Sequence, residues 1–268
     1  MAAIRTFIWP RTPRVRCSGW GRCRSALKTW NPITGCLHGC SYCWAQRFAQ
    51  RLATWGTEPY RTHGFHPAFA EWRLRRVPRG DLFVGDMGDM WGDWVPPEWI
   101  ARVLATLRGR HGVGHLFLTK NPKRYLEFRG AFTENMMLGV TIESNRVHPV
   151  SRAPSPRERF EAMAALRWPN KAVVIEPVLD FDDAFIGWIE AIEPVTVYVG
   201  YDNYHHRLPE PCLAKTEELI RTLRHRLAVT VRALRPAWHE GRTARDQGAP
   251  PSPTGETYRG TTPYSTAC

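Results

Sequence analysis

Short apolar runs alternate with helix-like stretches through the middle of the chain. Strands spaced by helices of this length predict βαβ units and a parallel sheet. Right-handed crossovers then curl such a sheet into a full or partial (β/α) barrel. The predicted strands span 29–33, 81–85, 115–119, 136–141, 172–175, 196–199 and 228–231, and the predicted helices span 42–54, 97–110, 122–128, 156–166, 181–192 and 213–226.

Most of the predicted strands end on polar or charged residues immediately after an apolar run. In a (β/α) barrel the chemistry collects at the carboxyl ends of the strands, so these residues are expected to share one site. They are Gly35-Cys36, Asp86-Met87, Thr119-Lys120, Thr141 to Glu143, Glu176-Pro177, Gly200 to Asp202 and Arg232.

The two ends of the chain differ from its middle. Residues 1–27 contain arginines and prolines without a clear period and predict a flexible basic arm. Residues 239–268 are rich in Gly, Pro, Thr and Ser and predict a disordered tail. The expected organisation is therefore a basic arm (1–27), a barrel (28–238) and a tail (239–268).

The net charge of +12, from 37 Lys and Arg against 25 Asp and Glu, points to a polyanionic partner, with nucleic acid the first choice. Most of the positive charge is arginine, which makes bidentate contacts to phosphate. No run approaches a membrane-spanning length and no secretory leader opens the chain, so we expect a cytoplasmic protein, in a phage or bacterial host cytosol, that has no membrane partner. Seven cysteines, three of them in one short loop, argue for a reduced compartment and a metal site, and against a disulfide framework.

Cys36, Cys40 and Cys43 form a C-x3-C-x2-C pattern with Tyr42 directly before the last cysteine. Three thiolates on one loop can hold three irons of a [4Fe-4S] cluster and leave the fourth iron open. The alternative is a zinc site completed by His38, Cys17 or Cys23, although no second ligand pair is present. Cys17, Cys23, Cys212 and Cys268 are interpreted as incidental thiols.

This loop resembles the signature of the radical S-adenosylmethionine (SAM) superfamily, C-x3-C-x-aromatic-C. The segments that follow resemble more narrowly the phage Gp37/Gp68-like family, from about residue 29 to residue 235. They are Phe83 to Met90, Leu118 to Arg124, Leu138 to Glu143 and Ile175 to Leu179.

The resemblance implies a partial (β/α), TIM-like barrel of the radical SAM type. It implies Cys36, Cys40 and Cys43 as cluster ligands, and SAM bound at the open iron. Tyr42 would lie near the adenine, or simply pack under the loop. Gly85 and Asp86 would receive the ammonium of SAM, although this stretch departs from the usual Gly-Gly-Glu-like segment, and Thr141 and Glu143 would meet the ribose. The alternative for Asp86 is a turn with solvated acids. The alternative for Glu143 is a helix-capping acid or a surface pair.

Two further residues are candidates for catalysis. Glu176 directly follows Val173, Val174 and Ile175, and an acid at a buried strand end needs a partner. Lys120 follows a strand at the start of a helix, where positive charge is disfavoured, so a functional reason for it is expected. Three tryptophans crowd the same stretch as Gly85 to Asp89, namely Trp91, Trp94 and Trp99. They either pack into the core or form a stacking platform for a base.

The expected function is that of a radical SAM enzyme, which cleaves SAM reductively and abstracts hydrogen from a nucleic acid or a nucleoside-bearing substrate. Flavodoxin or ferredoxin is the expected electron donor. The alternatives are radical modification of a peptide or small metabolite, and a zinc-stabilised nucleic-acid-binding module without catalysis.

Overall fold

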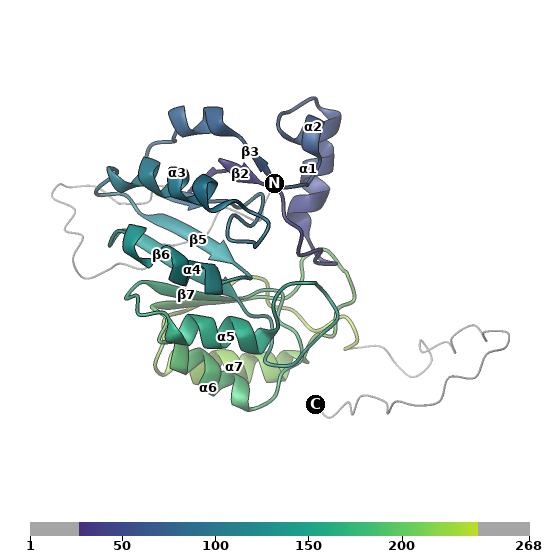
Figure 1. Cartoon of the computed structure of the whole chain (residues 1–268). Coiled ribbons are helices and arrows are strands. Elements are labelled where there is room, and N and C mark those ends of the chain that lie inside the picture. The colour runs from purple at the N-terminus through teal and green to yellow at the C-terminus, as the bar shows by residue number, and fades with distance from the viewer. Residues whose placement is uncertain (1–26, 241–268) are drawn as a thin grey trace, which may run out of the picture.

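A parallel seven-stranded sheet forms the centre of the computed structural model, which describes residues 27–240 (Figure 1). The strand order is β1-β4-β5-β6-β7-β8-β9, and every neighbouring pair is parallel. The strands are β1 (Lys28–Trp30), β4 (Leu82–Val84), β5 (His115–Thr119), β6 (Met136–Thr141), β7 (Lys171–Ile175), β8 (Thr196–Val199) and β9 (Val229–Val231). Among these residues β1 pairs only with β4 and β9 only with β8, so the barrel is partial.

Helices connect successive strands and cover the outside of the sheet (Figure 1). They are α3 (Pro97–Arg108), α4 (Lys123–Glu127), α5 (Pro156–Ala165), α6 (Ala184–Ile192) and α7 (Leu213–Arg224). Helix α3 buries Ile100, Val103, Leu104 and Leu107, which share one face at helical spacing. Helix α5 begins with a capping box in which Ser155 and Glu158 satisfy each other's backbone N–H groups.

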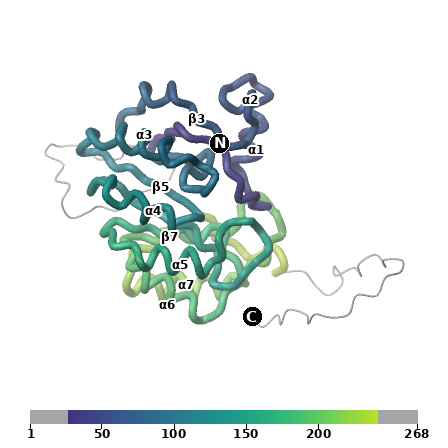
Figure 2. Tube along the Cα trace, in the orientation of Figure 1, coloured from purple at the N-terminus to yellow at the C-terminus, as the bar shows by residue number. Residues whose placement is uncertain are grey.

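An additional unit lies between β1 and β4 and stands at the opposite side of the picture from α5, α6 and α7 (Figure 2). It contains β2 (Ile33–Thr34), α1 (Trp44–Thr54), α2 (Tyr60–His63), β3 (Ala68–Phe69) and the 3-10 helix η1 (Glu71–Arg75); a second 3-10 turn, η2 (Arg129–Ala131), follows α4. Strands β2 and β3 form a small antiparallel pair.

Both faces of the central strands are buried. Phe117, Leu138 and Val173 belong to the large core beneath the helices, whereas Leu116 and Met137 belong to a separate cluster. Strands that are buried on both faces have continuous apolar sequences rather than alternating ones, so these strands could be predicted from the sequence.

The predicted α/β partial barrel is confirmed, and the strands at 115–119 and 136–141 have the predicted bounds. The predicted strand at 29–33 is wrong in detail, because it is divided into β1 and β2 at Asn31-Pro32. Proline has no N–H to donate to a sheet ladder, which accounts for the break. Residues 1–26 of the predicted arm and 241–268 of the predicted tail, with Cys17, Cys23 and Cys268, lie outside the described residues. No helix of residues 27–240 has the length and apolar character needed to cross a membrane.

Candidate active site

The cysteine loop joins β2 to α1. Cys43 is the N-cap residue of α1, and its Sγ accepts a hydrogen bond from Gln46 N–H at 3.3 Å. Cys36 Sγ accepts one from His38 N–H at 3.4 Å. Gly35 has φ +82°, and a Cβ there would lie 2.2 Å from the carbonyl oxygen of His66. The start of the loop therefore needs glycine both for its conformation and for its space.

Backbone hydrogen bonds hold this loop from three separate parts of the chain. The partners lie at the end of β4, in the segment before β3 and in the long loop after β6. The bonds are Gly35 N–H to Met87 O (3.0 Å), Cys36 N–H to Phe65 O (3.1 Å), Asp89 N–H to Gly35 O (3.2 Å), Ser41 N–H to Val150 O (2.9 Å) and Arg152 N–H to His38 O (2.7 Å). The three cysteines are therefore held at the carboxyl-end edge of the sheet.

A cavity of about 280 Å³ opens at this edge, and all three cysteines line it. Every strand end predicted to share a site contributes at least one lining residue, whereas Gly35, Met87, Ile142, Glu143 and Gly200 of those strand ends do not line the cavity. The lining includes Tyr42, Gly85, Asp86, Asp89, Thr119, Lys120, Thr141, Glu176, Tyr198, Asp202, Asn203 and Arg232. The expectation that the strand ends face one shared space is thus met by residues from β4 to β9.

The cysteine thiols fit an iron–sulfur cluster in kind and in setting. All three are free and half-buried. Burial raises the pKa of the Cys36 thiol, to which the nearby charge of Asp89 adds, and burial likewise raises the pKa of Cys43. Thiolates are the ligands that iron–sulfur clusters use, and binding of the metal displaces their protons. Within residues 27–240, no three His, Cys, Asp or Glu side chains converge as the ligands of a single metal ion do.

Glu143 is a buried anion that ties three elements together. Its Oε1 accepts hydrogen bonds from the Tyr42 hydroxyl and from Lys120 Nζ (2.5 Å), and its Oε2 accepts one from Arg159 Nη1 (2.6 Å). Arg159 also donates to Thr141 O at 2.7 Å. Burial opposes ionisation, but the positive charges of Lys120 and Arg159 hold the pKa of Glu143 far below its ordinary value. Glu143 is only 2% exposed, so its carboxylate fixes Tyr42 and Lys120 in the cavity wall from behind.

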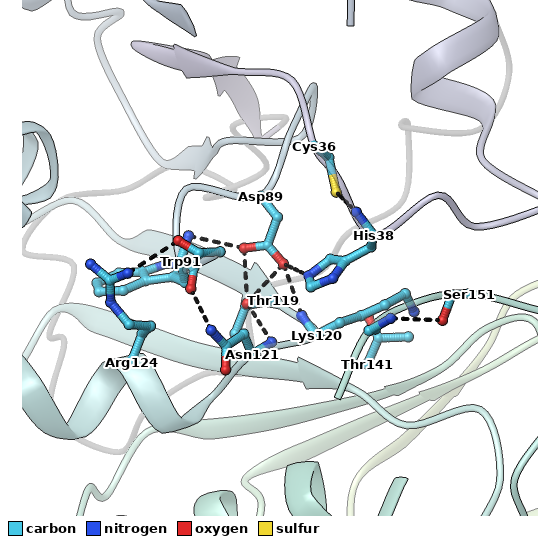
Figure 3. Close-up of polar contacts among 12 residues, drawn as sticks. Cys36, His38, Asp89, Trp91, Thr119, Lys120, Asn121, Arg124, Thr141 and Ser151 are labelled. Atoms are coloured by element: carbon cyan, nitrogen blue, oxygen red, sulfur yellow. Dashed lines mark hydrogen bonds and ion pairs between the residues drawn. The ribbon is translucent and has the colours of Figure 1, made fainter. Parts of the chain in front are cut away.

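Asp89 is a second buried anion, which the sequence did not single out (Figure 3). Its carboxylate accepts hydrogen bonds from His38 Nε2 (3.0 Å), Thr119 Oγ1 (2.8 Å), Lys120 N–H (3.0 Å) and Trp91 N–H (3.0 Å). Burial opposes ionisation, but the hydrogen bonds from His38 and from the β5 end hold its pKa below the ordinary value. Asp89 therefore links the cysteine loop to the ends of β4 and β5. The only sequence signal was its position three residues after Asp86 in a Gly-rich stretch.

His38 lies between Cys36 and Cys40 and is one of the three residues, with Cys17 and Cys23, expected as the fourth ligand in the zinc alternative. Its ring is buried, bonded to Asp89 and packed edge-on against Trp94, with ring centroids 4.8 Å apart. Trp91 is fully buried in the core, which is the first of the two alternatives for these tryptophans. Trp99 is half-buried and stacks on Phe69.

Glu176 follows β7 and Arg232 follows β9, and both line the cavity. In the strand order they are far from β1, the strand that precedes the cysteine loop. Glu176 is half-buried, with Oε2 3.8 Å from Arg232 Nε and Oε1 3.4 Å from Asn203 Nδ2. Burial raises the pKa of Glu176, and the charge of Arg232 opposes the rise. The partner that a buried strand-end acid requires is therefore Arg232.

Asp86 lines the cavity and accepts a hydrogen bond from Asn31 Nδ2 at 2.6 Å. Burial raises its pKa to about 6, so the folded protein disfavours the ionised carboxylate. A raised pKa means that the contribution of Asp86 to stability is present below its ordinary pKa of 3.8 and is lost as the pH rises through about 6.

Asp86→Asn is therefore expected to increase the free energy of unfolding at pH above about 7 by roughly 2–3 kcal/mol, and to leave it nearly unchanged near a pH of about 3. Urea unfolding at both pH values measures the effect. Asp183→Asn, at an exposed position, is the matched control and should change little at either pH. An equal gain from Asp86→Asn at both pH values would show that desolvation of its charge is not the cause.

A family model with the description "Protein of unknown function (DUF5131)" matches residues 23–192. The narrower Gp37/Gp68-like resemblance is not part of that description and stays a prediction. No curated protein matches the chain.

Among solved structures, the chain is similar to a spore photoproduct lyase mutant with bound AdoMet and dinucleoside spore photoproduct. The identity is 11% and the TM-score 0.49, covering 79% of this chain and 65% of that one. It is also similar to a radical SAM methyltransferase from Sphaerobacter thermophilus, with 16% identity and a TM-score of 0.44, covering 76% of this chain and 66% of that one. The chain thus spans about two thirds of the length of each.

Proposed function

This chain belongs to the family described as "Protein of unknown function (DUF5131)", and we propose that it acts as a radical SAM enzyme. One observation carries the proposal. The complete C-x3-C-x-aromatic-C loop lies at the carboxyl-end edge of a parallel partial barrel, and its three cysteines line the same cavity as polar residues at the ends of β4 to β9. Cys36, Cys40 and Cys43 would hold a [4Fe-4S] cluster and leave one iron open for SAM.

When bound and reduced, the cluster supplies one electron that cleaves SAM to methionine and a 5′-deoxyadenosyl radical, which abstracts hydrogen from the substrate. The protein supplies binding, orientation and exclusion of water. The backbone of Gly85 and the carboxylate of Asp86 are the proposed receptors for the ammonium of SAM. An ammonium beside Asp86 would offset the cost of ionising this buried carboxylate.

Tyr42 and Thr141 are proposed to receive the nucleoside part of SAM, whereas Glu143, expected from the sequence to meet the ribose, lies behind the cavity wall and would act by holding Tyr42. Thr141 lines the cavity directly, and the Tyr42 ring is held in the wall by the bond from its hydroxyl to Glu143. Lys120 and Glu176 are the proposed residues for substrate chemistry. The Lys120 ammonium is fixed by Glu143, and Glu176 is a carboxyl of raised pKa that can hold a proton at the cavity wall.

The substrate proposed first is a nucleic acid or a nucleoside-bearing molecule, because the chain is strongly basic. Flavodoxin or ferredoxin is the proposed electron donor, and the host cytosol the proposed compartment. Modification of a peptide or a small metabolite by the same chemistry is the alternative within the enzyme class.

Anaerobic reconstitution tests the proposal. The full chain should become brown, bind about four irons and four sulfides per protein, and form 5′-deoxyadenosine from SAM after chemical reduction. Mass spectrometry of the small molecules measures this product. A colourless protein that binds one zinc instead would support the zinc-stabilised module. A reduced, intact cluster that forms no 5′-deoxyadenosine, even with candidate substrates, would exclude the radical SAM activity.

A further inference from the structure

The segment from Trp44 to Arg79 is strongly basic. It spans α1, α2, β3 and η1 and contains seven arginines against two glutamates, with no lysine or aspartate. Both glutamates already have partners, since Glu58 pairs with Arg61 and Glu71 pairs with Arg102 of α3. Most of the arginine charge of this segment is therefore left to face solvent, and Arg47, Arg51, Arg75, Arg76 and Arg79 are all exposed.

Large aromatic side chains are interleaved with these arginines. Trp55, which ends α1, is 65% exposed, and Trp72 in η1 is 46% exposed; no other tryptophan of residues 27–240 is exposed. The Arg73 guanidinium carbon lies 5.8 Å from the centre of the Trp72 ring. Exposed tryptophan is costly in water, and its pairing with arginine is typical of surfaces that bind flat, anionic partners.

A second cavity, of about 440 Å³, opens where α1, α2 and η1 meet. Its walls are aromatic and apolar, with two arginines and one carboxyl, which is the composition expected of a ligand site. The lining includes Trp44, Phe48, Tyr60, Arg73, Arg76 and Asp86. Arg73 is fixed there by hydrogen bonds to Asn31 O (2.7 Å) and Glu58 O (3.2 Å).

This second cavity adjoins the first. Trp44 and Asp86 line both of them, and Trp44 directly follows the cluster cysteine Cys43. In Figures 1 and 2 the α1–α2 unit stands apart from α5, α6 and α7, so a ligand can approach it without crossing the outer helices. A chain-like ligand lying over α1 and η1 would thus pass beside the proposed catalytic cavity.

We propose that this arginine–tryptophan face, formed by residues 44–79, binds single-stranded nucleic acid and that the second cavity receives one of its bases. Arginines would contact the phosphates and the aromatic rings would stack on bases, the two contributions on which single-strand binding generally depends. A duplex hides the flat faces of its bases, and an acidic peptide has charge without rings to stack. The role of this face would be to bring a neighbouring nucleotide to the first cavity, and that role rests on the proposed function.

Fluorescence anisotropy with a labelled, mixed-sequence single strand of roughly 16 nucleotides tests the face. The test variant is Arg75→Gln/Arg76→Gln, and Arg108→Gln/Arg224→Gln, at exposed ends of α3 and α7, removes the same charge elsewhere. Because each phosphate contact contributes about 0.7 to the log–log salt slope for single strands, the test pair should reduce that slope by about 1.4. The control pair should leave it near the wild-type value. Trp72→Ala should weaken binding on the order of tenfold, with the salt slope unchanged.

Equal losses in the test and control pairs would overturn the proposal, as would tighter binding of a duplex or equal competition by polyglutamate of matched charge. The last result would favour an acidic protein partner. If circular dichroism shows that Trp72→Ala does not fold, the comparison of the two exposed arginine pairs still tests the proposal. Formation of 5′-deoxyadenosine without nucleic acid is measured separately. If no 5′-deoxyadenosine forms but nucleic acid still binds through Arg75 and Arg76, the proposed enzymatic activity is wrong and the proposed binding face is supported.

Discussion

Replacing any one of Cys36, Cys40 and Cys43 by alanine should abolish both the bound cluster and the formation of 5′-deoxyadenosine. Each thiolate is expected to bind a different iron, so two thiolates cannot hold the cube. The loss of activity should be complete rather than partial, because the remaining residues of the cavity supply no electron. Iron and sulfide content after anaerobic reconstitution, and the yield of 5′-deoxyadenosine, measure the two losses.

Cys212→Ala is the matched control. Cys212 is a free, buried cysteine at the start of α7 and does not line the cavity. It should keep the full cluster content, although the smaller side chain in the core will cost some stability. Full iron and sulfide content in the triple alanine variant would mean that the cluster is held elsewhere or that the metal is bound nonspecifically.

Glu143→Gln should lower the free energy of unfolding by about 3–5 kcal/mol. The substitution leaves the buried cations of Arg159 and Lys120 without their counter-charge, and breaking one partner of a buried ion pair has a cost of this size. Thermal or urea unfolding at neutral pH measures it. Glu161→Gln, which removes an exposed partner of Arg157, is the control and should cost at most about 0.5 kcal/mol.

The pH dependence separates this explanation from a simple packing defect. The depressed pKa of Glu143 means that its contribution is present above the ordinary value of 4.5 and is lost as the pH falls below it. The difference between wild type and Glu143→Gln should therefore shrink in acid. A difference that stays constant down to pH of about 3 would show that the ion pairs to Lys120 and Arg159 do not carry the effect.

The sequence predicted those parts of the fold that depend on continuous apolar runs. The strands β5 and β6 are buried on both faces, so their patterns had little competition from surface residues. The short elements α2, β3 and η1 were missed, because each has five residues or fewer and depends on contacts with distant parts of the chain. The hydrogen bond from Trp30 Nε1 to Arg73 O, which fixes η1 against β1, has no local signal in the sequence.

The sequence predicted those parts of the candidate site in which a polar or charged residue directly follows a strand. The positions of Thr141, Lys120 and Glu176 in the cavity wall follow from their place after an apolar run. The roles of Asp89 and Arg159 as buried partners were not predictable. Arg159 lies on α5, sixteen residues after Glu143, and only the packing of that helix against β6 brings their side chains together.

The backbone hydrogen bonds around the cysteine loop make the folding of this chain independent of metal binding. None of these five bonds uses a sulfur atom, because each joins a backbone N–H to a backbone carbonyl, and the acceptors are the carbonyls of Met87, Phe65, Gly35, Val150 and His38. The conformational entropy of the loop is therefore lost when the barrel folds, not when iron arrives. Zinc fingers behave in the opposite way, because their metal supplies the folding free energy. If the proposed cluster were destroyed by oxygen, the protein would stay folded with its three cysteines in place, so the damage could be repaired by reloading rather than by new synthesis.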